Sequence, residues 1–435
     1  MLGTLIVSMR TIHISRTIGL KTLFSENNSA EGGQRMESSN AGTTEVCILS
    51  NSWRGGSGWF THELASSIAQ AGVRVTFIAP PMLPLSKEAA GQNIDRRLTP
   101  RVDSIDASLL RRRLATLKRL IVNIRELWRA RSTAQVFLFN HVGHVIIELV
   151  VALMVRLWGR HLILVVHDPT PHTWMLPSWG RGLERLVYKI DFSLATHIVC
   201  LSSTSRKVLL KEYNLAPDRV SVIPHGSYDL GEPSPIPKNG QILVFGFIRP
   251  NKLVKESILA VQKYRREGGQ LRLLVTGSSG PAVYTAECLE LAKLDPTGTE
   301  VDVRFVPEEE IPSIIAEVDA ILLPYREFNS QSGVAVLAGM SARPVIGSDA
   351  GGLADLFEMG LAGIRIQGDP SVDTIADALR LFQDRPLESW EREARAARRV
   401  LLRQLGWTAI GGSYASLISR IAGSTVEPSI KPHVG

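Results

Sequence analysis

The segment Ser330–Leu353 constrains the fold of this chain more than any other part of the sequence. It contains two loop-to-helix turns, Ser330–Gly333 and Asp349–Gly352, which are joined by a short apolar strand. The first turn leaves the apolar strand Ala320–Pro324 and opens a helix predicted over Val334–Met340. Small residues at such turns let backbone N–H groups approach an oxyanion, which the positive end of the helix favours. One such turn is as well explained by an ordinary helix cap, but two in series favour an α/β protein that binds a phosphate ester.

A third strand-to-helix turn, upstream of these two, carries two cations. A buried strand is predicted at Gln241–Gly246, and Phe247–Lys252 leads from it into a helix. Arg249 and Lys252 would then lie at the carboxyl end of a parallel strand, which is the end where open α/β sheets bind ligands. Arginine as a bidentate fork and lysine as a point charge can clamp a diphosphate. Taken alone, such charges are more often solvated loop residues.

Together these segments resemble the donor domain of GT-B glycosyltransferases of the retaining family 4 type. The resemblance extends from about Val46 to the C-terminal helix, and it is specific for the family but not for a sugar. Its motifs follow the family's order and are Val222–Gly226, Gly246–Lys252, Ser330–Pro344 and Ser348–Leu353. The resemblance implies two Rossmann-like, doubly wound parallel-sheet domains that face a cleft. The sugar nucleotide would bind to the second domain and the acceptor to the first.

The resemblance also implies a set of donor-binding residues. They are Gly246, Arg249, Lys252, Glu327, Ser330, Gln331, Ser332, Gly333, Val334 and Leu337. The family carries two glutamates around the cradle glycine, of which the first faces the sugar and the second the ribose. Here Leu337 or Ala338 stands where the second would lie. The first is either replaced by Ser330 and Gln331 or displaced to Glu327, so the sequence leaves open how the ribose is held.

The first half of the chain supplies candidates for the acceptor side. An apolar strand at Glu45–Ser50 is followed by a glycine-rich loop and by a helix predicted over Phe60–Ala71. Gly55, Gly56 and Gly58 lack the spacing of a dinucleotide fingerprint. By the resemblance this loop faces the cleft, with Gly56 as the residue that a ligand approaches. A plain tight turn explains the glycines equally well.

Two polar residues follow the strand predicted at Leu162–Val166. Because they lie at its carboxyl end, His167 can orient the acceptor or bind the donor sugar, and Asp168 can fix the tautomer of His167 or cap the loop. A lone histidine is usually structural, but this position makes a catalytic role as good an interpretation. His225, in the junction motif, is a further candidate for the cleft. Weaker candidates are His141, His144 and His172.

Length and linker residues suggest the domain organisation, because 435 residues are many for one core. The predicted order is a disordered or mis-assigned extension (1–43, with Met36 as an alternative start), an acceptor-binding Rossmann-like domain (44–228), a Gly- and Pro-rich linker (229–240), a nucleotide-sugar-binding Rossmann-like domain (241–394), C-terminal helices that by the resemblance cross back to the first domain (395–425), and a flexible tail (426–435).

Basic residues gather on a helix predicted over Arg111–Arg131. We expect its apolar residues to form a core stripe under a solvated basic face; they are Leu114, Leu117, Leu120, Ile121, Ile124 and Leu127. A formal charge of +7 and a pI of about 9.4 make an anionic membrane surface the better functional partner, since no nucleic-acid motif appears. The apolar run His144–Trp158 is too short to span a bilayer comfortably and is predicted to be a buried helix.

The predicted activity is that of a retaining glycosyltransferase that moves a hexose from a nucleotide-diphosphate sugar to a saccharide or lipid-linked saccharide acceptor. Such a reaction belongs to polysaccharide or glycoconjugate biosynthesis. No Asp-x-Asp triad occurs, so we expect neither a metal nor a cofactor beyond the sugar nucleotide as co-substrate. The scattered Cys47, Cys200 and Cys288 fit a cytoplasmic protein. Two alternatives remain open: a sugar-nucleotide 2-epimerase of the same fold, and a nonenzymatic GT-B partner subunit.

Overall fold

The computed structural model describes residues 44–52, 55–81, 91–101, 109–141, 145–169, 178–227, 230–326 and 329–423. The predicted extension 1–43 and tail 426–435 lie outside these residues, as do Glu327, His144 and His172. No helix in the described part of the chain has the length and hydropathy of a membrane span. The three cysteines are buried free thiols.

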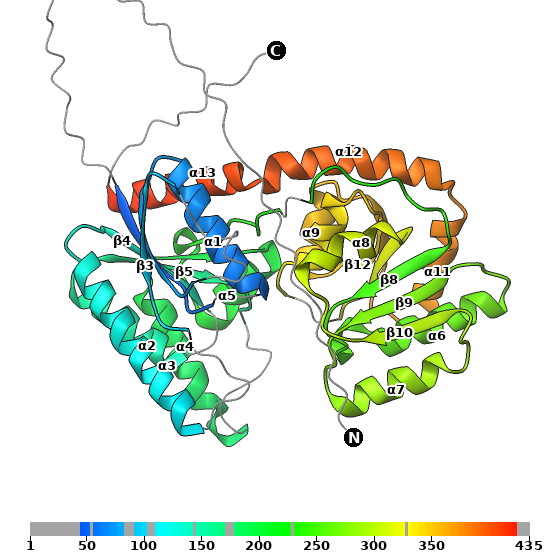
Figure 1. Ribbon diagram of the computed structural model, residues 1–435, viewed down its shortest axis with the longest axis horizontal. Helices are drawn as coiled ribbons and strands as arrows, with labels where there is room; N and C mark the ends of the chain where they lie inside the picture. Colours follow the sequence, from blue (N-terminus) through cyan, green and yellow to red (C-terminus); the bar gives the residue numbers. More distant parts are fainter. Residues whose placement is uncertain are drawn as a thin grey trace, which may run out of the picture. The chain divides into compact units, whose positions relative to one another are not determined.

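A seven-stranded sheet occupies the first half of the described chain, and all its strands are parallel (Figure 1). The spatial order is β3-β2-β1-β4-β5-β6-β7. The strands are β1 (Glu45–Leu49), β2 (Arg74–Ala79), β3 (Ile94–Leu98), β4 (Val136–His141), β5 (His161–Val166), β6 (His197–Cys200) and β7 (Val220–Val222). The order reverses between β1 and β4, which is where open parallel sheets bind ligands at the carboxyl ends of their strands.

Helices cover both faces of this sheet, because its strands alternate between two apolar cores. Val46 and Ile48 face α1 (Gly55–Gln70) and α13 (Trp407–Ala422). Cys47 and Leu49 face the opposite core. The helices on that side, most of which Figure 1 labels, are α2 (Leu109–Ala130), α3 (Val145–Leu157), α4 (Arg181–Leu194) and α5 (Ser203–Tyr213), with the short η2 (Ser178–Gly180) before α4.

The second half of the described chain forms a six-stranded parallel sheet in the order β10-β9-β8-β11-β12-β13. Its strands are β8 (Gln241–Phe245), β9 (Arg272–Gly277), β10 (Thr299–Val303), β11 (Ala320–Leu323), β12 (Val345–Ser348) and β13 (Gly363–Ile366). One core lies against α6 (Val254–Arg266), α7 (Ala282–Ala292) and α11 (Val372–Gln383). The other contains residues of α8 (Ile311–Ala316), α9 (Gly333–Met340), α10 (Gly351–Glu358) and the end of α12 (Leu387–Leu405). The predicted class, two doubly wound parallel-sheet domains, is confirmed.

The last helix of the described chain belongs to the core of the first sheet. Ile410, Tyr414 and Ile418 of α13 are buried with residues of β1, β2 and α1. Gly411 lies so close to α1 that a Cβ at this position would overlap the backbone carbonyl of Ser67. Gly226, at the junction after β7, meets the ring of Trp407 in the same way. Two glycines therefore set how closely this helix packs.

Three sequence predictions about helices need correction. The first helix begins at Gly55 and not at Phe60, because hydrogen bonds from Thr61 and Asn140 to Ser57 hold the glycine-rich turn in helical form. The apolar row of α2 is not a core stripe, since Leu114, Leu117 and Ile121 are more than half exposed.

The third correction concerns α3, predicted to be a buried helix. Val151, Ala152 and Val155 are indeed buried, but Val150, Leu153 and Leu157 are exposed. A helix that lies on a sheet buries only the stripe facing that sheet. The apolar residues in excess of this stripe remain on the surface of the first sheet's domain.

Candidate functional site

The loops after β8 and β11 meet where the order of the second sheet reverses. Gly246 follows β8 with a φ of 101°, which favours glycine. A Cβ there would lie 2.8 Å from the Lys252 Nζ, so the missing side chain leaves room for this ammonium group. The sequence analysis predicted Lys252 at the carboxyl end of a parallel strand, and the contact of its Nζ with the end of β8 matches that position.

Lys252 is held at this strand end by its own neighbours. Its Nζ donates to the Phe245 carbonyl at 3.1 Å and lies 5.6 Å from the ring centroid of Tyr325. Burial, and to a lesser degree the charge of Arg249, lowers the pKa of Lys252 to about 8. A bound anion would stabilise the ammonium form of Lys252 at this buried place and would raise its pKa again.

Arg249 lies on the outer side of the same turn. It is exposed, and its guanidinium carbon lies 4.6 Å from the ring centroid of Phe247. The two cations thus differ in their surroundings: Lys252 is anchored beside the sheet, while Arg249 extends from an exposed turn. A diphosphate at the end of β8 could contact both.

The start of α9 provides backbone donors next to this turn. Ser332 caps the helix, since its hydroxyl accepts from the Ala335 N–H at 3.2 Å and its carbonyl accepts from the Val336 N–H at 3.1 Å. In the described structure this leaves the N–H groups of Gly333 and Val334 at the helix end for a ligand. An anion there would also gain from the helix dipole.

The cradle loop before α9 is fixed by neighbouring backbone. Gly352 packs so closely on Ser330 and Gln331 that a Cβ would overlap them, and its N–H donates to the Ser330 carbonyl at 3.2 Å. The Asn329 carbonyl accepts the hydroxyls of Ser202 and Ser205, each at 2.7 Å. The second glycine turn, which we expected to be another anion cradle, thus supports the first.

Gln331 presents an amide toward the same region. Its Oε1 accepts from the His225 backbone N–H, whereas its Nε2 is buried with no partner in the described structure. A buried donor without an acceptor is costly unless a ligand or water supplies one. Leu337 and Ala338, by contrast, are buried in the apolar core beside β11.

A chain of hydrogen bonds fixes His167 after β5. The Thr61 hydroxyl donates to the Ser57 carbonyl at 2.8 Å, so its oxygen accepts from the Asn140 Nδ2 at 3.1 Å. This sets the orientation of the Asn140 amide, whose Oδ1 lies 2.7 Å from the His167 Nε2. Because an amide oxygen only accepts, the His167 Nε2 carries a proton.

Two of the predicted histidines share one aromatic neighbour. The ring centroid of Phe60 lies 4.9 Å from that of His167 and 4.8 Å from that of His225. The His225 Nδ1 lies 2.7 Å from the Gly226 carbonyl, which requires a proton on Nδ1. Burial lowers the pKa of His225, so its ring is neutral near pH 7.

Comparison with known proteins agrees with this architecture. The family model described as Glycosyltransferase Family 4 matches residues 54–227, and the model described as Glycosyl transferases group 1 matches residues 239–384. The chain is a GT-B glycosyltransferase of the family 4, group 1 type. The comparison of this chain with curated protein sequences found no match.

Solved structures share the fold at low sequence identity. Anabaena HepE in complex with UDP and glucose is 15% identical, with a TM-score of 0.65 over 87% of this chain and 100% of that chain. Sucrose-phosphate synthase from Thermosynechococcus elongatus is 15% identical, with a TM-score of 0.65 over 88% and 100%. WaaG, a glycosyltransferase involved in lipopolysaccharide biosynthesis, is 16% identical, with a TM-score of 0.56 over 86% and 99%.

The other predicted site residues of the glycosyltransferase lie at the starts of its loops and helices. Gly55 and Gly56 form the first turn of α1, and a Cβ at Gly56 would meet open space. Asp168 follows His167 and is partly buried. Glu327 falls outside the described residues. No group of three or more His, Cys, Asp or Glu in the described part of the chain could hold a metal ion.

Sequence reasoning missed Asn140, Phe60 and Tyr325, which orient or adjoin the predicted residues. Asn140 lies near the carboxyl end of β4, next to the point where the sheet order reverses. A polar residue near the end of an apolar strand was the available signal. Phe60 and Tyr325 resembled ordinary core aromatics, and nothing in their sequence surroundings marks them.

Proposed function

We propose that this glycosyltransferase binds a nucleotide-diphosphate sugar at the ends of β8 and β11 and transfers its hexose, with retention, to an acceptor at the first sheet. The observation that carries this proposal is that the turn with Arg249 and Lys252 follows β8 while the start of α9 follows β11, the strand paired with β8. Support also comes from HepE, whose structure holds UDP and glucose on the same fold.

In the proposed reaction, the bond between the anomeric carbon and the diphosphate oxygen breaks while the acceptor oxygen bonds to that carbon on the same face. The acceptor's proton passes to the departing phosphate. Negative charge grows on the diphosphate, so Arg249, Lys252 and the N–H groups of Gly333 and Val334 stabilise the transition state more than the ground state. With these groups in place, the reaction needs no resident metal ion.

Gln331 and His167 would act on the sugar. The Gln331 Nε2, which lacks a protein partner in the described structure, can donate to a sugar hydroxyl. The His167 ring, oriented by Asn140, would face the acceptor or the sugar. The ribose would lack a carboxylate from α9, since Leu337 and Ala338 turn into the apolar core.

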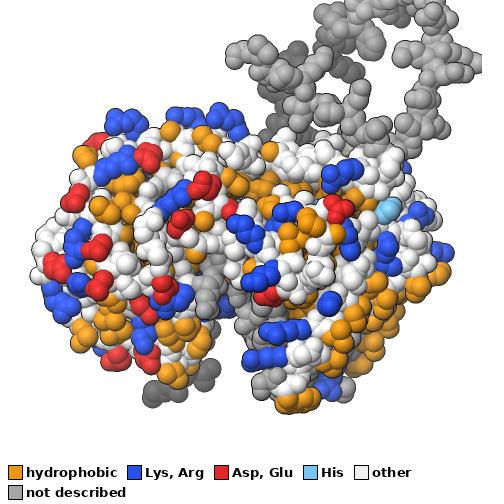
Figure 2. All heavy atoms as spheres, turned by 180° about the vertical axis from the view of Figure 1, so that it is seen from behind, with side chains coloured by type: hydrophobic (Ala, Val, Ile, Leu, Met, Phe, Trp, Pro, Cys, Tyr) orange, Lys and Arg blue, Asp and Glu red, His pale blue; other side chains and the backbone are white. Residues whose placement is uncertain are grey.

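We also propose that the first sheet's domain rests on an anionic membrane and takes a lipid-linked saccharide from it. Exposed apolar side chains gather on α2, α3, η2 and α4, with basic residues beside them. This apolar-basic face consists of Leu114, Leu117, Ile121, Trp128, Val150, Leu153, Leu157, Trp179, Leu183, Leu186 and Ile190, with Arg113, Lys118 and Lys189. The lower right of Figure 2 shows hydrophobic and basic side chains together on this domain.

Lipid suits this face better than water does. Monomers rarely expose a large contiguous apolar patch, and apolar side chains beside cations are typical of surfaces that lie in the interface of anionic lipid. WaaG, which is involved in lipopolysaccharide biosynthesis, shares the fold. A lipid-linked acceptor would reconcile membrane contact with a chain in which no described helix can cross a bilayer.

Turnover of a nucleotide-sugar panel tests the catalytic proposal. We expect the purified protein to release a nucleoside diphosphate from one donor, and Arg249→Ala to lower turnover about 10²- to 10³-fold because stabilisation of the leaving group is lost. Arg249 is exposed, so the variant should fold normally. Near-normal turnover in this variant would show that Arg249 is not part of the donor site. A 2-epimerised sugar among the products would show that the reaction is epimerisation and not transfer.

A further inference from the structure

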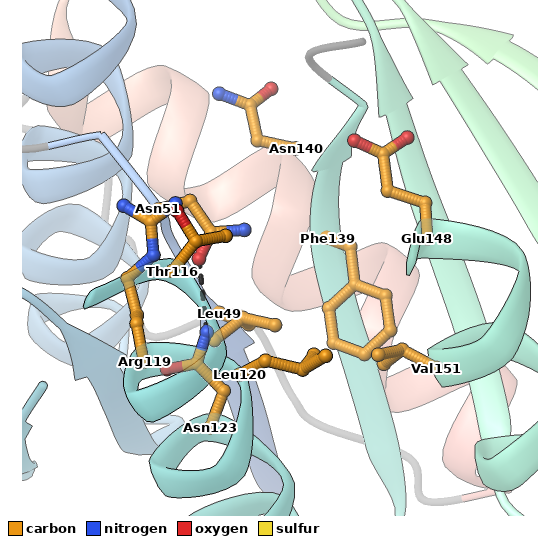
Figure 3. Close-up of a pocket in the computed structure, with 10 residues that line it drawn as sticks. All are labelled: Leu49, Asn51, Thr116, Arg119, Leu120, Asn123, Phe139, Asn140, Glu148 and Val151. Carbon is orange, nitrogen blue, oxygen red and sulfur yellow. Dashed lines mark hydrogen bonds between the residues drawn. The ribbon is translucent and has the colours of Figure 1, made fainter. Parts of the chain in front are cut away.

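A cavity of about 110 Å³ lies where the order of the first sheet reverses, at the ends of β1 and β4 (Figure 3). α2 and α3 form its sides. Its apolar lining consists of Leu49, Leu120, Phe139 and Val151. One water needs about 10–15 Å³, and a cavity of about 150 Å³ admits a six-membered ring such as benzene. The cavity is therefore large enough for part of a ligand.

A buried amide in the cavity wall points to a ligand. Asn123 of α2 is only 4% exposed, and its Nδ2 donates to the Asn51 Oδ1 at 2.9 Å, the bond drawn in Figure 3. In the described structure the Asn123 Oδ1 is buried with no hydrogen-bond partner. An unsatisfied buried acceptor is destabilising, because it loses its hydrogen bonds to water and gains none in the protein. Because this oxygen is buried, a ligand hydroxyl can donate to it only if the Asn123 side chain turns toward the cavity, and that contact would then satisfy the acceptor.

The charges of the cavity favour a neutral ligand. Arg119 of α2 lies on one side and Glu148 of α3 on the other, so the formal charges of this pair cancel. A phosphate drawn to Arg119 would meet the carboxylate of Glu148. Hydroxyl groups suit both side chains, because each can donate to a carboxylate and accept from a guanidinium. The ring of Phe139 offers an apolar surface for C–H groups.

The cavity is also joined to the candidate catalytic histidine. Asn140 lines it, and the same side chain accepts the proton on the His167 Nε2. We propose that this cavity is part of the subsite for the terminal sugar of the acceptor, a neutral hexopyranosyl residue that places some of its hydroxyls in the cavity, against Arg119, Asn123 and Glu148. The assignment rests on the proposed function and names where the acceptor saccharide binds.

Saturation-transfer NMR with the full chain tests this subsite. The probes are the methyl α- and β-pyranosides of glucose, galactose and mannose, and n-butyl phosphate serves as an anionic competitor. We expect at least one glycoside to bind, and Arg119→Met and Asn123→Leu each to weaken its binding about tenfold, which corresponds to one lost hydrogen bond. The matched control is Arg160→Met, because Arg160 is also partly buried but lies before the amino end of β5. It should bind the glycoside like the wild type.

Three results would overturn the assignment: no glycoside binds, the two variants bind as tightly as the wild type, or butyl phosphate displaces the glycoside. Hydrolysis of the nucleotide sugar by the purified protein distinguishes failure of this subsite assignment from failure of the proposed function. If cleavage persists while the glycoside test fails, the cavity is not the acceptor subsite but the catalytic proposal stands. If glycoside binding depends on Arg119 and Asn123 while no donor is cleaved, the subsite stands and the catalytic proposal fails.

Discussion

Lys252 is subject to two opposing effects at a single nitrogen. Its position beside the sheet favours the neutral amine and lowers its pKa to about 8, whereas a bound diphosphate would favour the ammonium form. In the unfolded chain the pKa is near 10.5, so between about pH 8 and 10.5 the unfolded state binds more protons than the folded state. The contribution of Lys252 to stability therefore becomes more favourable as the pH rises through this window.

We predict that the pH dependence of the nucleoside diphosphate Kd reveals these two opposing effects. Below about pH 8 the ammonium is already charged and the Kd of the nucleoside diphosphate should be constant. Above it, binding must take up a proton, so the Kd should rise by up to about tenfold per pH unit. Calorimetry between pH 7 and 9.5 measures this, and Lys252→Arg, which stays charged throughout, should remove the break. If the break in the pH dependence persists in Lys252→Arg, another titrating group causes it.

A second prediction concerns Asn140 as a positioning residue for His167. Asn140→Leu removes the acceptor for the Nε2 proton, so turnover should fall by about one to two orders of magnitude. Nucleoside diphosphate affinity should not change, since that site is on the other sheet. Asn140→Asp keeps an acceptor oxygen and should restore much of the turnover, with the pH profile moved upward because a carboxylate raises the pKa of His167. Equal losses in both variants, with no shift of the profile, would leave Asn140 only a structural role.

At the scale of elements, the exposed side of α2 combines apolar and basic residues in a way that only the fold reveals. A core stripe and a membrane stripe have the same spacing of leucines, and the sheet decides which one is buried. Leu127 faces the sheet, while Leu114, Leu117 and Ile121 face outward. The residues of α3 and α4 extend this outward row to a surface.

We predict that charge on this face controls binding to anionic vesicles. Each Lys or Arg near such a surface contributes about 1 kcal/mol, so changing Arg113, Lys118 and Lys189 together to Gln should weaken binding about 100-fold at low salt. The same net charge change on α12, at Arg392, Arg399 and Arg403, is the control and should have little effect. Cosedimentation with vesicles measures both. If the two triple variants lose binding equally, net charge and not this face is responsible.

Local patterns predicted the strands and turns that carry the proposed donor site, and tertiary contacts decided the rest. Buried parallel strands followed by glycine turns, such as β8 with Gly246 and β11 with Ser330–Gly333, have local signals that identify them. The edge strand β10 forms at Thr299–Val303, where polar and apolar residues alternate, so it lacks the continuous apolar run that marks the buried strands. The cavity beside Asn123 combines residues of β1, α2, β4 and α3, which no spacing along the chain reveals.

At the scale of the whole molecule, α13 belongs to the core of the first sheet although it is the last described helix. Two adjacent glycines test how it is held. A Cβ on Gly411 would overlap the Ser67 carbonyl, whereas one on Gly412 would meet nothing within 4 Å. The same substitution at neighbouring positions thus separates helix packing from helix propensity.

We predict that Gly411→Ala destabilises the protein by about 1–3 kcal/mol, because α1 and α13 must move apart. Gly412→Ala should be neutral or stabilise by up to about 1 kcal/mol, since alanine is the better helix former. Thermal or urea unfolding of the two variants measures the difference. Equal melting temperatures for the two would mean that α1 and α13 are not tightly packed in solution.

The place of α13 also affects how the protein is made on the ribosome. Five buried residues of α13 complete a core whose other buried members lie between Val46 and Ile223; they are Ile410, Tyr414, Ala415, Leu417 and Ile418. At about 5–20 residues per second, the nascent first sheet waits on the order of ten seconds or more before this helix emerges. During that time the part of this apolar face that α1 leaves uncovered is open to chaperones or to other nascent chains. Chains that end before Trp407 would keep the surface that α13 covers exposed, so we expect them to aggregate or to be degraded.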